Sequence, residues 1–214
     1  MSGGALRLEA VAIAVGGRSL LGPLDLTVPP GTVVTVMGPS GSGKSTLLSW
    51  ICGTLDPAFS ADGRAWLAET ELTPLPPEAR RVGILFQDDL LFPHLSVGQN
   101  LAFGLPAAVR GRAARRARVE AALAEADLGG FADRDPATLS GGQRARVAVM
   151  RTLLADPRAL LLDEPFSRLD AELRDRFRRF VFSHASKLPT LLVTHDPADA
   201  AAAGGPLLRL DGGG

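Results

Sequence analysis

The chain has 214 residues, of which 46% are hydrophobic and 21% charged, and these proportions indicate a globular protein rather than a disordered one. Its 23 basic and 23 acidic residues cancel, which argues against a dedicated nucleic-acid-binding protein, because such proteins usually carry a basic excess. The single cysteine, Cys52, excludes an internal disulfide. We expect no signal peptide at residues 1–4 and no run of the roughly 20 apolar residues that a membrane-spanning helix needs.

In chain order, the first apolar patterns predict strands at Leu6–Val15, 24–28 and Val33–Met37, followed by a helix at Lys44–Cys52. Several prolines and a glycine interrupt residues 56–77, so we expect loop and edge-strand structure there. The remaining predicted elements are strands at 82–86, 159–162 and 190–194 and a mostly helical region at 88–155. Strands that alternate with helices predict an α/β core with a parallel sheet.

A glycine-rich turn joins the third predicted strand to the first helix and fits the pattern G-x-x-x-x-G-K-[ST]. Its members are Gly38, Pro39, Ser40, Gly41, Ser42, Gly43, Lys44, Ser45 and Thr46. The backbone N–H groups of such a turn form a concave anion site at a helix N-terminus. We expect Lys44 to reach the β- and γ-phosphates of a nucleotide and the Ser45 hydroxyl to ligate Mg²⁺. Alone, this loop leaves GTPases, kinases and helicases open.

An acidic pair, Asp163 and Glu164, ends the apolar run at 160–162. The strand would aim Asp163 at the Mg²⁺ site, because open α/β sheets bind ligands beyond the carboxyl ends of their strands. Glu164 is then free to polarise an attacking water as a general base. The alternative is a strand followed by a solvated acidic turn, which is a common arrangement.

A second candidate anion site precedes the amphipathic segment 144–155 and consists of Leu139, Ser140, Gly141, Gly142 and Gln143. Ser140 is a predicted N-cap, and the two glycines leave the backbone N–H groups uncovered. An ordinary capped helix would explain Ser-Gly-Gly by itself, but not the full five-residue string.

These motifs together resemble those of ABC ATPases, and they cover nearly the whole chain in the order of that family. The phosphate loop at 38–46 is similar to Walker A, 139–143 to the signature and 160–164 to Walker B. Gln87 corresponds to the Q-loop glutamine, Asp170 to the D-loop aspartate and His195 to the switch histidine.

The resemblance implies a P-loop NTPase fold with a mostly parallel core sheet, an N-terminal antiparallel β subdomain and an α-helical subdomain. We expect one ABC ATPase domain over 1–214, with core and β subdomain at about 1–87 and 156–214 and the helical part at about 88–155. It also implies a head-to-tail homodimer, in which each MgATP lies between the phosphate loop of one copy and the signature of the other. Glu164, His195 and Gln87 would then be catalytic, Ser45, Gln87 and Asp163 would hold Mg²⁺, and Asp170 would act across the dimer.

Residues 87–97 are similar to importer ATPases that serve solute-binding proteins, which implies a peripheral motor on the cytoplasmic face of the inner membrane. Two membrane permease subunits would dock near 87–97, although Phe92, Pro93 and Leu95 could instead be buried core. The alternative is a soluble ABC ATPase acting on DNA or ribosomes, which usually carries tandem cassettes or long insertions. The chain departs from the family at Val15, where an aromatic residue usually stacks on adenine, and it contains no tyrosine. Base stacking is therefore weak or supplied elsewhere.

The arginines of the predicted helical region form a basic cluster: Arg110, Arg112, Arg115, Arg116 and Arg118. We expect a solvated face, with Glu120 and Glu125 near enough for pairing, rather than a site for nucleic acid or lipid headgroups.

Overall fold

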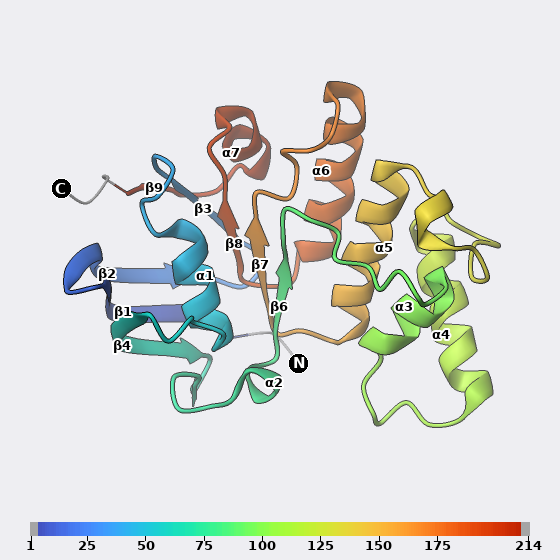
Figure 1. Cartoon of the computed structure of the whole chain (residues 1–214), viewed down its shortest axis with the longest axis horizontal. Helices are drawn as coiled ribbons and strands as arrows, with labels where there is room; N and C mark the ends of the chain where they lie inside the picture. Colours follow the sequence, from blue (N-terminus) through green and yellow to red (C-terminus); the bar gives the residue numbers. More distant parts are fainter. Residues whose placement is uncertain (1–3, 211–214) are drawn as a thin grey trace.

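The structure is a computed structural model that describes residues 4–210. Residues 1–3, which are part of the segment expected to lack a signal peptide, and residues 211–214 of the expected domain lie outside the described residues. Two β-sheets and the helices that cover them make up the chain (Figure 1). Among the described residues, no helix has the length and apolar character that crossing a membrane requires.

A five-stranded parallel sheet forms the centre, with strand order β6-β7-β8-β3-β9. Its strands are β3 (Val33–Met37), β6 (Val82–Leu85), β7 (Ala159–Asp163), β8 (Thr190–Val193) and β9 (Leu207–Arg209). Nearly all side chains of β7 and β8 are buried, as expected of parallel strands covered on both faces. Successive residues of β7 serve opposite cores, because Leu161 packs with one hydrophobic cluster and Leu160 and Leu162 pack with another.

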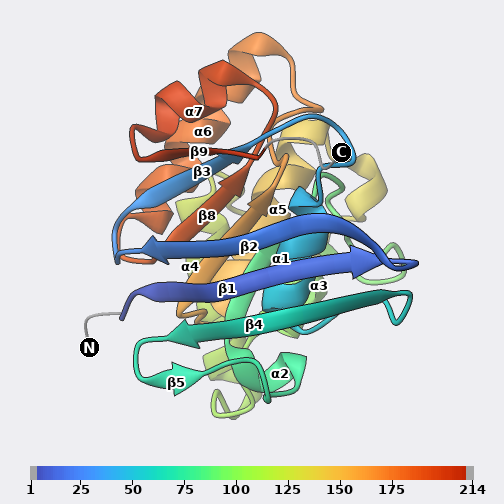
Figure 2. The ribbon, with the colours of Figure 1, turned by 90° about the vertical axis from the view of Figure 1, so that its left-hand side faces the viewer.

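A second, antiparallel sheet has the order β2-β1-β4-β5 and faces the reader in Figure 2. Its strands are β1 (Leu6–Val15), β2 (Arg18–Val28), β4 (Phe59–Leu67) and β5 (Thr70–Glu71). Helix α1 (Lys44–Cys52) lies between this sheet and the parallel one, and its residues Leu47, Leu48 and Ile51 are completely buried there (Figure 1). The phosphate loop therefore leads into a helix that packs against both sheets.

The expectation of loop and edge-strand structure at 56–77 is wrong for β4, which is an inner strand paired with β1 and β5. Gly63, with φ +104°, permits this pairing because a Cβ there would lie only 2.7 Å from Val11 Cα. Opposite it, β1 is irregular between Glu9 and Ala12, and Ala10 has a positive φ of 48°. The glycine marks a bulged sheet, not the end of a strand.

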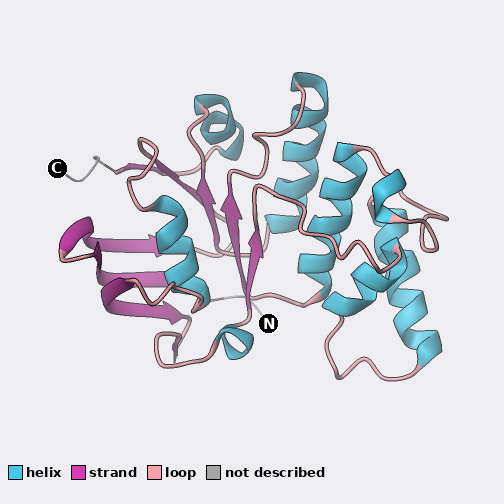
Figure 3. Ribbon diagram, viewed as in Figure 1, coloured by secondary structure: helices cyan, strands magenta, loops and turns pink. Residues whose placement is uncertain are grey.

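Helices on the other face of the parallel sheet include α5 (Gly141–Leu154) and α6 (Ala171–Ala185), which pack on Leu160 and Leu162 (Figure 3). Beyond α5, α3 (Val97–Gly104) and α4 (Arg112–Glu125) form a separate hydrophobic cluster with it. Short helices complete the described elements: α2 (Pro77–Arg80), the 3₁₀ turn Pro136–Thr138 and α7 (Pro197–Ala203). The predicted helical character of 88–155 corresponds to this part of the chain.

Candidate functional site

The predicted motifs follow four neighbouring strands of the parallel sheet at their carboxyl ends. The phosphate loop follows β3, the acidic pair ends β7, His195 follows β8 and Gln87 follows β6. Because β6, β7, β8 and β3 are adjacent and parallel, all four ends meet at one edge. Residues far apart in sequence thus share one site.

The phosphate loop is closed around its lysine. Lys44 is buried, and its ammonium donates hydrogen bonds to the carbonyl oxygens of Gly38 and Pro39 at 2.9 and 2.7 Å. Gly43 precedes α1 with φ +83°, and no side chain caps the helix. The first-turn N–H groups of α1 therefore remain open to an anion.

Ser45 and Asp163 meet beside this loop. The Ser45 hydroxyl donates a hydrogen bond of 2.9 Å to Asp163 Oδ1. Burial raises the pKa of Asp163 above its usual value, with a further increase from neighbouring Glu164, while the Ser45 hydrogen bond and Lys44 oppose the shift. Two oxygen donors of the type that Mg²⁺ prefers are thus held together where a nucleotide phosphate would lie.

Glu164 and His195 form a second close pair. His195 Nδ1 lies 3.1 Å from Glu164 Oε1, and the histidine side chain is 65% exposed while the glutamate is 25% exposed. Glu164 has a left-handed φ of 46°, a strained conformation for a residue with a side chain, and its N–H donates to the Val193 carbonyl at 2.9 Å. This hydrogen bond anchors the backbone of Glu164 to the end of β8.

A buried polar network supports the turn that carries His195, and sequence reasoning did not find it. Asp199, 3% exposed, accepts hydrogen bonds from the Thr194 hydroxyl at 2.6 Å and from Arg178 Nε at 2.8 Å. On the other side of His195, Asp196 accepts a hydrogen bond of 3.0 Å from Arg174. The residues on both sides of His195 are therefore anchored to α6, which holds Arg174 and Arg178.

A cavity of about 430 Å³ opens above the phosphate loop, within the range usual for small-molecule sites. Its lining residues are Val15, Leu20, Ser40, Gly41, Gly43, Lys44, Ser45, Thr46, Phe59 and Glu164. The predicted site residues that do not line it are Gly38, Pro39, Ser42, Gln87, the signature at 139–143, Asp163, Asp170 and His195, and Gln87 is exposed. Phe59 and Leu20 were not predicted, because no local motif marks them and Phe59 lies in the segment expected to be loop and edge strand.

The signature starts α5 at a distinct place on the surface. Ser140 caps the helix by accepting a hydrogen bond from Gln143 N–H at 3.3 Å, and Gln143 Oε1 accepts one from Ser140 N–H at 2.9 Å. Gly142 approaches α6 so closely that a Cβ would lie 2.5 Å from Leu173 Cδ2. Asp170 caps α6 by accepting from Leu173 N–H at 2.9 Å. The signature and the D-loop aspartate are thus neighbours.

Comparison with known proteins places this geometry in a family. Residues 21–167 match the family described as ABC transporter. The uncharacterized ABC transporter ATP-binding protein YnjD of Escherichia coli K12 is 53% identical over 199 residues, covering 92% of this chain and 91% of YnjD. The Fe(3+) ions import ATP-binding protein FbpC of Brucella abortus 2308 is 40% identical over 213 residues, covering 99% of this chain but 60% of FbpC. A dimeric structure of the ATP-binding cassette MJ0796 with ADP and Pi matches with a TM-score of 0.80 at 28% identity, covering 97% of this chain and 96% of that one.

The parallel sheet, the phosphate loop and these matches define the class: the chain belongs to the ABC transporter family. It is an ATP-binding ATPase subunit of that family, which confirms the resemblance and the fold class inferred from the sequence.

The buried network around His195 yields a stability prediction. We expect Asp199→Asn to lower the free energy of unfolding by about 2–3 kcal/mol, because the buried Arg178 would lose its one buried carboxylate partner and keep only Asp196 and the exposed Asp175. Asp175→Asn is the matched control, since Asp175 also pairs with Arg178 but is 64% exposed, and we expect it to cost less than about 1 kcal/mol. Urea unfolding measures both, and equal losses would contradict the network's role.

Proposed function

We propose that the protein is the ATP-hydrolysing motor of an importer, in which ATP binding closes a head-to-tail dimer and hydrolysis reopens it. The observation that carries this proposal is the separation of its two anion-binding helix starts. The phosphate loop opens into the cavity that Val15 also lines, whereas the signature at 139–143 lies outside the cavity lining and is exposed to solvent at Gly141. A second copy would bring its signature to the first copy's phosphate loop.

In this proposal separate groups of residues bind the phosphates, hold Mg²⁺ and activate the attacking water. The open N–H groups at the start of α1 and Lys44 hold the phosphates, while Ser140, Gly141, Gly142 and Gln143 of the partner approach the γ-phosphate. Ser45 and Asp163, with Gln87, would hold Mg²⁺, which when bound neutralises charge on the phosphates. Glu164 takes a proton from the attacking water, and the water oxygen displaces ADP from the γ-phosphorus. His195 orients Glu164 across their 3.1 Å contact.

A surface next to the site fits the predicted docking of permease subunits near 87–97. Phe86, Leu90 and Phe103 are large apolar side chains that are 45%, 55% and 68% exposed. The rings of Phe92 and Phe103 lie 4.7 Å apart, so the loop at Phe92 contacts α3 at Phe103. Exposed large apolar side chains on a loop and the adjoining helix are what a docking site would offer a partner.

Two side chains hold this loop in place: Arg151 donates to the carbonyl oxygens of Asp89 and Leu90, and Asn100 holds residues 92–96. Asn100, 0% exposed, donates to the carbonyl oxygens of Phe92, Leu95 and Ser96 and accepts from Phe92 N–H. Phe92, Pro93 and Leu95 are all at least partly exposed, which favours docking over the core alternative. A loop fixed in this way can bind without a large ordering cost.

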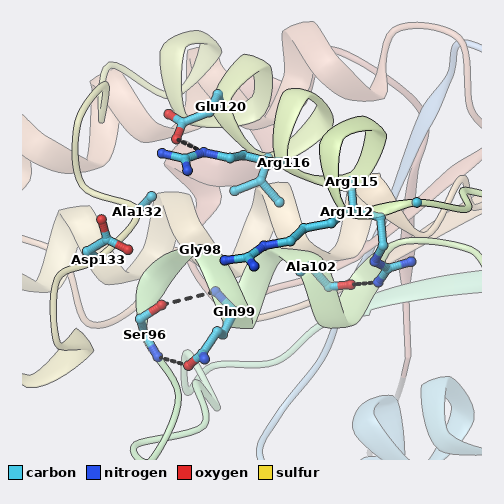
Figure 4. A pocket seen from close by; sticks show the side chains of 12 residues that line it. Ser96, Gly98, Gln99, Ala102, Arg112, Arg115, Arg116, Glu120, Ala132 and Asp133 are labelled. Carbon is cyan, nitrogen blue, oxygen red and sulfur yellow. Dashed lines mark hydrogen bonds and ion pairs between the residues drawn. The ribbon is translucent and has the colours of Figure 1, made fainter.

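Beside the loop, a cavity of about 560 Å³ lies between α3 and α4 (Figure 4). Arg112 extends across α3 toward Gly98, while Arg116 approaches Glu120 at 3.8 Å and Arg115 donates to Ala102 O at 2.5 Å. The expected solvated face is correct for Arg110, Arg112, Arg116 and Arg118, which are exposed. Arg115 instead links α4 to α3, and Glu125 lies 3.0 Å from His184 rather than beside these arginines. A cytoplasmic loop of a membrane subunit could enter this cavity, with Arg112 available to its acidic groups.

Relatives that match are named for import of Fe(3+) ions in Brucella abortus and of sulfate or thiosulfate in Gloeobacter violaceus. This chain spans 60% and 56% of the lengths of these two relatives. We propose a peripheral position at the cytoplasmic face of the inner membrane, with solute recognised by separate membrane and solute-binding subunits.

The hydrolysis proposal predicts that Glu164→Gln binds MgATP, elutes as a dimer in size-exclusion chromatography and hydrolyses ATP about a hundred- to ten-thousand-fold more slowly. Removing the base leaves the phosphate contacts intact, so ATP stays trapped between two copies. Glu69→Gln, at an exposed turn, is the control and should turn over normally. A Glu164→Gln chain that stays monomeric with ATP and keeps full turnover would overturn the proposal.

The docking proposal predicts that Leu90→Lys reduces recovery of integral membrane proteins with the tagged chain by about tenfold, without weakening ATP binding. A charge on an apolar contact must be desolvated when the subunits meet. Leu207→Lys, 45% exposed on β9, should change neither property. Unchanged recovery with Leu90→Lys would contradict docking here, and recovery of ribosomes or DNA in place of membrane proteins would favour the soluble alternative.

A further inference from the structure

Part of the lining of the cavity above the phosphate loop is apolar. Val15, Leu20 and Phe59 form this part, whereas the phosphate loop and Glu164 supply the polar lining. Leu20 lies directly against the loop, because its Cγ is 3.1 Å from the position that a Cβ on Gly43 would take. A ligand held at the phosphate loop that extends toward these side chains would meet hydrocarbon and one aromatic ring.

Phe59 faces the cavity because of strand pairing. It is directly opposite Val15 in the antiparallel register of β1 and β4, so the two side chains lie on the same face of the sheet. Val15 is 38% exposed and Phe59 is half-buried against the hydrophobic cluster that contains α1. The Phe59 side chain therefore packs partly against this cluster and is partly accessible from the cavity.

The start of β4 is also fixed. Asp56 accepts a hydrogen bond from Ala58 N–H at 2.8 Å through its side chain, and its carbonyl accepts one from Phe59 N–H at 3.0 Å. This turn, of the kind that aspartate stabilises, sets the position of the first residue of β4. Little ordering is then needed when a ligand binds against the ring.

We propose that Phe59 supplies the aromatic face on which the base of the bound nucleotide stacks, an inference that rests on the proposed function of the phosphate loop. A purine is flat and largely apolar on its faces, and Phe59 is the one aromatic side chain among the residues that line the cavity. Val15 offers a contact with the base edge but no ring. The aromatic surface is thus displaced from β1 to the neighbouring position on β4.

The consequence concerns specificity. Every base has a stacking face, so ring stacking favours nucleoside triphosphates over base-free triphosphate without selecting one base by hydrogen bonds. The stacking contact of one base with an aromatic side chain usually changes affinity by about tenfold. Phe59 therefore favours binding of a nucleotide over base-free triphosphate, and it raises the affinities for ATP and GTP by similar amounts.

The experiment measures the affinity of the full chain for ATP and for tripolyphosphate by calorimetry. Phe59→Leu keeps apolar packing but removes the ring, and we expect it to weaken ATP binding about tenfold while tripolyphosphate binding stays unchanged. Phe59→Trp should retain the wild-type ATP affinity. Phe131→Ala, which truncates a half-buried phenylalanine far from the cavity lining, is the control and should alter neither affinity.

The outcomes separate the two proposals. Wild-type ATP affinity in Phe59→Leu, or equal losses for ATP and tripolyphosphate, would overturn base stacking and leave Phe59 as a packing residue. A wild-type chain that binds neither ligand would contradict the phosphate-loop assignment, and the stacking inference with it. Loss of ATP affinity alone in Phe59→Leu, with rescue in Phe59→Trp, supports the inference.

Discussion

Parallel pairing of β6, β7, β8 and β3 is the constraint on which the whole site depends. It brings Lys44, Asp163 and His195, which lie far apart in sequence, to one edge of the sheet. The pairing is fixed because both faces are buried, with Leu161 on the side of α1 and Leu162 on the side of α5 and α6. A shift of one residue would exchange these faces and move Asp163 away from Ser45.

The local chemistry of the two helix starts differs in a way that suits a shared site. At α1 no side chain covers the first N–H groups, and the buried Lys44 already closes the loop. At α5 Ser140 satisfies the N–H of Gln143, which leaves those of Gly141 and Gly142 for another acceptor. One chain thus has one helix start that opens into a cavity and a second that is exposed on the surface at Gly141.

Elements with a local signal could be predicted from the sequence, whereas those that depend on distant partners could not. The bounds of β3 and α1 follow from a β-branched run, a glycine-rich turn and the mostly apolar segment after it. β4 was missed because Gly63 reads as a strand breaker until the bulge of β1 opposite it is known. The roles of Phe59 and of the Arg178–Asp199 pair could not be predicted for the same reason, since the residues that they contact come from other strands and helices.

The central claim, that each ATP lies between the phosphate loop of one copy and the signature of another, is tested most directly by mixing two inactive variants. Lys44→Ala removes the ammonium that binds the phosphates, and Ser140→Arg places a bulky side chain at the signature where ATP would bind. Homodimers of either variant are therefore inactive. A mixed dimer contains one intact site, and an equal mixture should therefore regain about one quarter of wild-type ATPase activity. No recovery on mixing, while each variant still folds, would contradict the shared site.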